Sequence, residues 1–337
     1  MDASAASPEI EEITHTAGLE ALRSEWWALW RRMPEATPFQ SPAWLLPWWQ
    51  VFGQGELLTL AFREHGRLTG LLPLYVLKAE GCRKLLPLGI GITDRLDPLL
   101  TAALARLAVR HLASRAHVFD RIDLMELAPD SPLLSVAAPE GWSDEVQACE
   151  PRPVLTLPQG PEELRRAVPR LGKLGYYRRR AAALGRAEIR TATERTLAEH
   201  LDALFRLHGA RWTERGEPGV LADREVQAFH RLAAAALLSS GLLRSYALHI
   251  DDRIAAVLHG FADRRRFHAY LGGHDPDLRH PGPGALMIGH AIEEACRESL
   301  ESFDFLRGRE PYKYAWGAVD HPACGRRLQP AAQPLRK

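Results

Sequence analysis

The sequence predicts an α/β protein of two domains, each built from a mixed β-sheet flanked by helices. The chain has 337 residues, which is more than a single hydrophobic core usually serves. In both halves, short runs with the period of a strand alternate with longer runs of helical period. Four prolines between positions 150 and 161 interrupt this pattern. We therefore expect an N-terminal domain over 1–152, a C-terminal domain over 153–325 and a flexible tail over 326–337.

Composition is that of a globular protein without a strong attraction to polyanions. Apolar residues make up 46% and charged residues 25% of the chain, and the formal net charge is +1. No apolar run reaches the ~20 residues of a membrane span, and the acidic segment 1–12 lacks the basic start of a secretory signal. The four cysteines are scattered without a Cys-x-x-Cys pair. These features predict a cytoplasmic protein with reduced thiols, no metal site and no large nucleic-acid footprint.

The N-terminal half is expected to contain helices around a hairpin. Ser41 can cap a helix that begins at Pro42, because Ser accepts a hydrogen bond from the first turn and Pro needs no N–H partner there. His65 and Gly66 mark the turn of the hairpin. The expected strands are 9–13, 57–63, 68–77 and 121–127, and the expected helices are 19–33, one starting at 42, and 99–114.

The C-terminal half is expected to begin with an interrupted basic helix and to continue through two helices into three consecutive strands. Leu201, Leu204, Phe205 and His208 recur on one face of a strongly helical run. The run 253–262 is almost entirely apolar, as a strand covered on both faces should be. The expected helices are 161–184, 197–214, 224–238 and 286–299, and the expected strands are 187–191, 242–250, 253–262, 266–272 and 302–306.

A glycine-rich segment immediately precedes the helix 286–299, and it reads Arg-His-Pro-Gly-Pro-Gly-Ala over 279–285. The start of a helix carries unpaired N–H groups and a partial positive charge, and glycines let a ligand approach the backbone closely. This arrangement favours a diphosphate site, although an ordinary turn before a helix is the alternative. We call the ligand that carries this diphosphate the cofactor. The residues expected to bind it are Arg279, Gly282, Gly284 and Ala285, with Leu271 and Gly272 on the preceding strand.

Several motifs together resemble a known family. They are Pro-Phe-Gln-Ser-Pro-Ala-Trp at 38–44, Thr-Asp-Arg-Leu-Asp-Pro at 93–98, Trp-Thr-Glu-Arg-Gly at 212–216, Pro-Gly at 281–282 and Asp-Phe-Leu-Arg-Gly-Arg-Glu-Pro-Tyr-Lys at 304–313. The chain resembles the GNAT-superfamily acetyltransferases of the cellulose-biosynthesis-associated type, and it is more distantly similar to Fem-type peptidyltransferases. The resemblance implies two tandem GNAT-like domains and acetyl-CoA or another acyl-CoA as donor. It does not imply an acceptor.

If the reaction transfers an acyl group from a thioester to an amine, removing the proton of the amine demands more free energy than releasing the thiolate. A lysine-like amine has a pKa near ~10.4, so about one molecule in 2500 is neutral at pH 7. We expect a base or acid near the strand beside the thioester. The candidates are Glu310 as first choice, then His268, with Tyr270 as an acid for the thiolate and Asp304 on the following strand.

Each of these candidates has a structural alternative. His268 and Tyr270 share one face of their strand and can instead pack against a helix. Asp304 can instead pair with Arg307 or Lys313. We otherwise expect Arg307 and Lys313 to bind an acidic acceptor or a cofactor phosphate.

The expected function is an acyl-CoA-dependent N-acyltransferase that acts on an amine of a small molecule or of a cell-envelope or polysaccharide precursor. A basic stretch over 173–186 is either a solvated face or a phosphate clamp, and the clamp leaves open a Fem-type transferase that uses aminoacyl-tRNA. A third possibility is an acyl-CoA-binding protein that has lost activity. The six tryptophans between 26 and 49 favour a hydrophobic core or a domain interface over a sugar-binding site.

Overall fold

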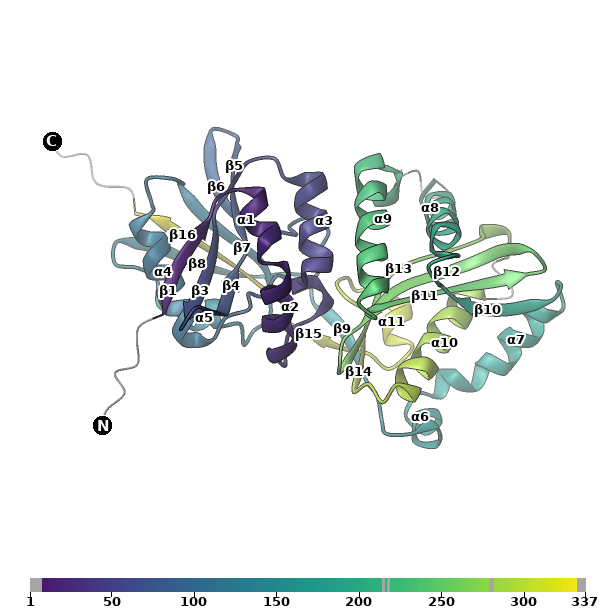
Figure 1. The fold of residues 1–337 in the computed structure, drawn as a ribbon. Helices are drawn as coiled ribbons and strands as arrows, with labels where there is room; N and C mark the ends of the chain where they lie inside the picture. The colour runs from purple at the N-terminus through teal and green to yellow at the C-terminus, as the bar shows by residue number, and fades with distance from the viewer. Residues whose placement is uncertain (1–7, 214–215, 217–218, 279–281, 332–337) are drawn as a thin grey trace. The chain divides into compact units, whose positions relative to one another are not determined.

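The computed structural model describes residues 8–213, 216, 219–278 and 282–331, and it divides the chain into two units (Figure 1). Unit 1 comprises Met1–Glu150 together with Pro322–Lys337, and unit 2 comprises Pro151–His321. The expected domain boundary at 152 and 153 lies close to this division. Within the expected tail, however, the described residues up to Pro330 continue β16 (Cys324–Pro330) and belong to unit 1.

Unit 1 contains two sheets. A three-stranded antiparallel sheet has the order β1-β3-β4, and a six-stranded sheet has the order β2-β5-β6-β7-β16-β8. Within the second sheet β6 and β7 run parallel, and α4 connects them. The strands are β1 (Glu9–Ile13), β2 (Glu56–Leu57), β3 (Thr59–Glu64), β4 (Arg67–Leu72), β5 (Leu74–Ala79), β6 (Cys82–Pro87), β7 (Arg121–Leu127), β8 (Trp142–Ala148) and β16 (Cys324–Pro330).

One helix of unit 1 begins at its predicted residue, Pro42, whereas the helix expected from residue 99 begins at Ala102. Ser41 occupies the N-cap of α3, although its hydroxyl donates to the carbonyl of Pro38 rather than capping the helix. The expected helix 19–33 is divided at Leu22. The helices are α1 (Thr16–Ala21), α2 (Arg23–Arg32), η1 (Pro38–Gln40), α3 (Pro42–Phe52), α4 (Ala102–Ser114) and α5 (Pro132–Ser135).

The clustered tryptophans of unit 1 belong to its interior. Trp26 and Trp44 have no exposed surface. The indole N–H of Trp26 donates to the carbonyl of Gln40 at 2.8 Å, and that of Trp44 donates to the hydroxyl of Thr93 at 2.8 Å. Because these polar atoms are already paired inside the unit, the two rings serve packing and not sugar binding.

Unit 2 contains a seven-stranded sheet of order β10-β11-β12-β13-β14-β9-β15. Figure 1 shows α8 and α9 on one face of this sheet and α10, α7 and α6 on the other. The strands are β9 (Arg152–Thr156), β10 (Ala187–Thr191), β11 (Leu243–Ile250), β12 (Arg253–Ala262), β13 (Arg266–His274), β14 (Ser302–Asp304) and β15 (Val319–His321). The helices are α6 (Pro161–Ala167), η2 (Pro169–Lys173), α7 (Leu174–Ala182), α8 (Leu197–Thr213), η3 (Val220–Ala222), α9 (Arg224–Ser239), η4 (Pro276–Leu278), α10 (Pro283–Arg297) and α11 (Pro311–Tyr314).

The main core of unit 2 lies between the sheet and α10. Phe267 of β13 stacks on Phe303 of β14 with ring centres 4.7 Å apart, and Met287 and Ala291 of α10 pack in the same apolar cluster. The helix α10 connects the parallel strands β13 and β14, as α4 connects β6 and β7. The two units therefore share a strand–helix–strand crossover, which supports the prediction of two similar domains.

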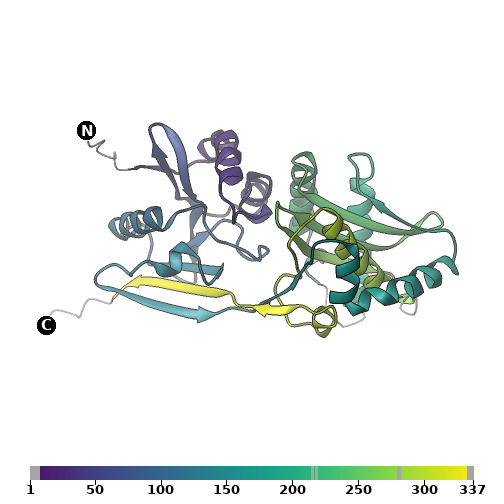
Figure 2. The same cartoon turned by 90° about the horizontal axis from the view of Figure 1, so that it is seen from below.

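Two segments expected to be irregular are strands. The first part of the predicted tail forms β16, which pairs with β7 and β8; Figure 2 shows it in yellow beside β8 in teal. The buried guanidinium of Arg326 fixes β16 by bonding to Asp144 and to the carbonyl of Val136. The proline-rich passage after residue 150 contains β9, which lies between β14 and β15. The polar and proline-rich composition of both segments concealed their role as strands.

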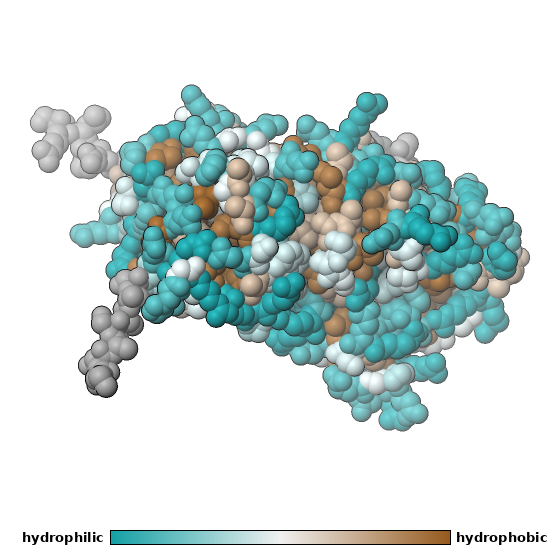
Figure 3. All heavy atoms as spheres, in the orientation of Figure 1, coloured by the Kyte–Doolittle hydropathy of each residue, from teal (hydrophilic) through white to brown (hydrophobic). Residues whose placement is uncertain are grey.

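Hydrophilic side chains dominate the face of the molecule seen in Figure 3. Among the described residues, no helix combines the length and apolar character needed to cross a membrane.

Candidate active site

The strands β13 and β14 separate after a short parallel pairing. They pair only over Arg266–His268 and Ser302–Asp304, whereas β13 continues to His274. From Ala269 onward, the edge of β13 on this side has no strand partner among the described residues. An open strand edge offers N–H and C=O groups to an extended ligand that contains amides.

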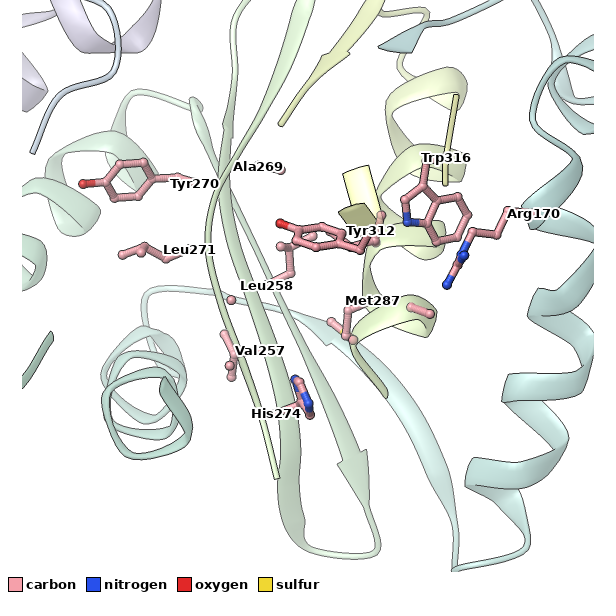
Figure 4. A pocket seen from close by; sticks show the side chains of 15 residues that line it. Arg170, Val257, Leu258, Ala269, Tyr270, Leu271, His274, Met287, Tyr312 and Trp316 are labelled. Carbon is pink, nitrogen blue, oxygen red and sulfur yellow. The ribbon is translucent and has the colours of Figure 1, made fainter. Parts of the chain in front are cut away.

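A β-bulge lies at the point where the strands separate. Ala269 and Tyr270 of β13 oppose the single residue Gly260 of β12. A side chain at Gly260 would stand 2.6 Å from the carbonyl oxygen of His268, so the bulge requires glycine there. Because of the bulge, Tyr270 and Leu271 lie on the same face of β13, as Figure 4 shows.

The bulge corrects part of the expected cofactor set. Strict alternation places Leu271 on the opposite face from Tyr270, but the structure puts both side chains on the face covered by α8 and α9. Leu271 therefore borders the cavity described next through its backbone. Gly272 also borders the cavity, and a side chain there would meet the carbonyl oxygen of Val257 at 3.5 Å and Leu258 at 3.7 Å.

A cavity of about 280 Å³ lies between the open edge of β13 and the first turns of α10 (Figure 4). It contains most of the residues expected to bind the cofactor and several that the sequence did not single out. Its described lining residues are Arg170, Val257, Leu258, Ala269, Tyr270, Leu271, Gly272, Gly273, His274, Gly284, Ala285, Met287, Ile288, Tyr312 and Trp316.

The N-terminus of α10 opens onto this cavity. Gly282 is its N-cap, with a φ of 68° that favours glycine, and a side chain there would lie 2.8 Å from the ring of Tyr177. The first intrahelical hydrogen bond among the described residues joins the N–H of Leu286 to the carbonyl of Gly282, so Gly284 and Ala285 belong to the first turn, whose N–H groups come before the first intrahelical donor. The expected ligand Arg279 lies outside the described residues.

His268 and Asp304 lie in the interior and do not line the cavity. The Nε2 atom of His268 is 2.9 Å from a carboxylate oxygen of Asp263, and its Nδ1 atom is 3.9 Å from Asp304. Asp304 also accepts the N–H of Leu306 at 2.8 Å. Burial raises the pKa of Asp263, but the hydrogen bond and charge of His268 outweigh burial, so this pKa lies below its ordinary value. The arrangement argues for a buried structural cluster and against His268 as the base.

Glu310 and Lys313 form a structural pair outside the cavity. Lys313 is 2% exposed, and its ammonium contacts the carboxylate of Glu310 at 2.9 Å. It also donates to the carbonyls of Leu306, Arg307 and Gly308 at 3.1, 2.6 and 3.2 Å. With four acceptors, the ammonium is occupied in holding the loop after β14. These contacts argue against Lys313 as a substrate ligand and give Glu310 a structural partner, and Arg307 also lies outside the described lining.

Replacing Lys313 with Met is expected to lower the free energy of unfolding by about 3 kcal/mol, because it leaves buried carbonyls without a donor. The matched control is Glu310→Gln, which removes only the half-exposed partner and should cost less than about 1 kcal/mol. Urea denaturation measures both values. An unchanged stability of Lys313→Met together with a raised KM for an acceptor would restore Lys313 to the substrate site.

Tyr312 is the residue whose role the sequence underestimates. Its side chain is 40% exposed and lines the cavity, and its hydroxyl points toward Ala269 at the bulge in Figure 4. Arg170, His274 and Trp316 were not singled out either. The position of Tyr312 within the motif 304–313 was the one signal that pointed to it.

Two neutral histidines, His230 of α9 and His259 of β12, lie near the ring of Tyr270. The ring of Tyr270 lies 5.6 Å from that of His230, which lies 6.4 Å from that of His259. Burial, with a smaller contribution from neighbouring histidines, lowers the pKa of His230 and of His259 to about 3. Both imidazoles are therefore uncharged at neutral pH. Among the described residues, no group of His, Cys, Asp and Glu is arranged to hold a metal ion.

These histidines predict a loss of stability in mild acid. Their pKa values are lower in the folded state than the ordinary ~6.5 of the unfolded chain, so unfolding takes up protons below pH 6.5. Between pH 7.5 and 5.5 each group should remove about 1.4 kcal/mol from the free energy of unfolding. Urea denaturation at the two pH values measures this, and His259→Leu should reduce the loss by one histidine's share. An equal pH dependence in the variant would refute the assignment.

Comparisons with known proteins agree with this geometry. The model of the Acetyltransferase (GNAT) domain matches residues 170–314, which include every described lining residue of the cavity except Trp316. No curated protein matches the chain. A conserved protein of unknown function from Bacteroides thetaiotaomicron VPI-5482 has a similar structure, with a TM-score of 0.62 at 12% identity over 96% of this chain and 99% of that one.

Two further solved structures share the fold. FemX has a TM-score of 0.62 at 11% identity over 96% of this chain and 95% of its own. The C-terminal domain of a putative lysylphosphatidylglycerol synthetase from Agrobacterium fabrum has a TM-score of 0.60 at 12% identity over 93% and 92%. At such identities the similarity concerns the fold alone. Residues 170–314 form a GNAT-type acetyltransferase domain, and the protein is an acyltransferase.

Proposed function

We propose that the protein is an acyl-CoA-dependent N-acyltransferase, with acetyl-CoA as the first donor to test. The observation that carries the proposal is the cavity between the open edge of β13 and the N-terminus of α10. Acyl-CoA joins a diphosphate to an extended chain that contains amides. The diphosphate matches the N-terminus of α10, and the amide chain matches the open edge of β13. The diphosphate would meet the N–H groups at Gly284 and Ala285, and the amide chain would lie along β13.

The residues at the bulge would act on the thioester end. A bulge leaves one residue of the ladder unpaired, so a backbone N–H near Ala269 can polarise a carbonyl oxygen. The hydroxyl of Tyr312 points toward the same place and can give its proton to the departing thiolate (Figure 4). No carboxylate belongs to the described lining. We therefore infer direct attack by the acceptor amine, and the amine's own proton leaves to water.

The acceptor is proposed as an amine of a small molecule or of a cell-envelope or polysaccharide precursor. The similarity to a putative lysylphosphatidylglycerol synthetase supports an envelope component. The cysteines described are all free thiols, and we propose a cytoplasmic location because disulfides are rare there.

An aminoacyl-tRNA donor is the second candidate. The similarity to FemX and the cations of α7 favour it. Part of this basic face is already used within the fold, because Arg178 pairs with Glu293 and Arg180 bonds to Tyr176. Lys173 and Arg179 remain exposed. A tRNA held by these groups would bind with an affinity that falls steeply with salt.

Thermal melting with acetyl-CoA, a longer acyl-CoA and free CoA, followed by thiol release with a panel of amines, tests the proposal. A ligand that binds the native state must raise the melting temperature. Stabilisation by acetyl-CoA together with amine-dependent thiol release would support the acyltransferase assignment. Stabilisation without release on any amine would favour an inactive binding protein. Stabilisation by aminoacyl-tRNA alone would favour the second candidate.

A further inference from the structure

The cavity beside β13 contains one side chain with a permanent charge among the described residues that line it, Arg170. This residue belongs to η2, and its guanidinium carbon lies 5.2 Å from the centre of the Trp316 ring. Figure 4 shows the two side chains together on the side of the cavity away from Tyr270. A cation–π contact of this kind holds the guanidinium in place while its N–H groups stay available.

The charge of Arg170 has no protein counter-ion among the described residues. Its Nε atom is buried without a hydrogen-bond acceptor, and no Asp or Glu lines the cavity. The guanidinium of Arg178 in α7, in contrast, pairs with the carboxylate of Glu293. A guanidinium whose Nε atom is buried without an acceptor is costly, so its position is best explained by a ligand that carries a negative charge.

The position of Arg170 separates this charge from the diphosphate site. Gly284 faces the ring of His274, which marks the end of the cavity at the start of α10. Arg170 lies instead beside Trp316, across the cavity from Tyr270, and Tyr312 lies between Trp316 and Ala269 in this view (Figure 4). An anion at Arg170 would therefore belong to the reacting end of a bound substrate.

We propose that Arg170 selects a substrate that carries a carboxylate close to the transferred acyl group. The proposal rests on the acyl-CoA-dependent function inferred above. The planar guanidinium fork matches a carboxylate with two hydrogen bonds, and the rings and aliphatic chains of Trp316, Met287 and Ile288 enclose a short carbon chain beside it. Either the acyl group or the acceptor supplies this carboxylate, as a dicarboxylic acyl-CoA or as an amino acid.

One experiment has two arms that distinguish these sources. The first compares the kcat/KM of succinyl-CoA with that of butyryl-CoA, using one amine. The second compares glycine with glycinamide as acceptor, using acetyl-CoA. In at least one arm, the substrate with the carboxylate should be preferred by about 10- to 100-fold, the range expected for hydrogen bonds to a charged partner.

Variants of Arg170 test whether this residue causes the preference. Arg170→Met keeps an unbranched apolar side chain beside Trp316 and should bring the ratio close to one, with the affinity for free CoA changed by less than about threefold. Arg170→Lys keeps the charge without the fork and should retain part of the preference. Arg166→Met is the matched control, because Arg166 of α6 is exposed and lies outside the cavity, and it should leave the ratio unchanged.

Three outcomes would overturn the proposal. The first is a ratio near one in both arms for the unmodified protein. The second is a preference that survives in Arg170→Met. The third is an equal loss of affinity for free CoA and for all acyl-CoAs in Arg170→Met, which would assign the residue to the phosphates of the donor. In all three cases the unmodified protein still binds CoA, so the proposed function would stand. If the unmodified protein does not bind CoA, both the proposed function and this proposal are overturned.

Discussion

Replacing Gly284 with Glu is expected to weaken acetyl-CoA binding about 30-fold and to lower kcat/KM by at least as much. The change puts a carboxylate in the first turn of α10, at the wall of the cavity where the diphosphate is proposed to lie. An anion at a helix N-terminus gains up to ~2 kcal/mol, which corresponds to about 30-fold in affinity. Calorimetric titration with acetyl-CoA measures the effect.

The fold should tolerate this substitution. An acidic residue in the first turn stabilises a helix, and glycine is a poor helix former, so the melting temperature should stay the same or rise. Gly284→Ala is the matched control, because its methyl group would meet the ring of His274 at an ordinary contact distance of 3.5 Å. Unchanged acetyl-CoA affinity in a folded Gly284→Glu would remove the diphosphate from this position.

Replacing Tyr312 with Phe is expected to lower kcat about 100-fold and to leave the affinity for acetyl-CoA nearly unchanged. General acid catalysis by a positioned side chain contributes about 10²- to 10⁴-fold, and the variant keeps the ring that lines the cavity while it loses the proton donor. Steady-state kinetics with a fixed amine gives kcat, and calorimetry gives the affinity.

Tyr314→Phe is the matched control for this change. Tyr314 lies on the same short helix, its hydroxyl donates to Asp320 at 2.8 Å, and it does not line the cavity. Loss of the Tyr314 hydroxyl should leave kcat within about twofold of the value for the unmodified protein. A Tyr312→Phe enzyme with full kcat would show that the thiolate needs no acid from this residue, whereas a parallel loss in both variants would indicate that α11 itself had shifted.

The start of α10 was accessible from the sequence because its signals are local. Gly282 needs a positive φ at the N-cap, Pro283 suits the first helical position, and Gly284 keeps the approach open, all within three consecutive residues. The crossover from β13 through α10 to β14 could also be predicted, because its signals are local in the sequence. An apolar strand, a glycine loop, an amphipathic helix and a second strand are read directly from periodicity.

The sequence pattern did not reveal the features that depend on contacts between distant residues. A period of two cannot locate the bulge, because Gly260 and the pair Ala269 and Tyr270 define it together on two strands. The burial of Lys313 depends on carbonyls of the preceding loop, so charge alone suggested a substrate ligand. The contact of Arg170 with Trp316 likewise joins opposite ends of the C-terminal unit.

The most direct test of the account is a calorimetric comparison of CoA with pantetheine, which lacks the diphosphate and the nucleotide, on the unmodified protein. If the diphosphate is held at the N-terminus of α10, CoA should bind at least about 30-fold more tightly than pantetheine. The Gly284→Glu variant should abolish most of that difference. Equal affinities for the two compounds, or no detectable binding of CoA, would contradict the assignment of this cavity to an acyl-CoA donor.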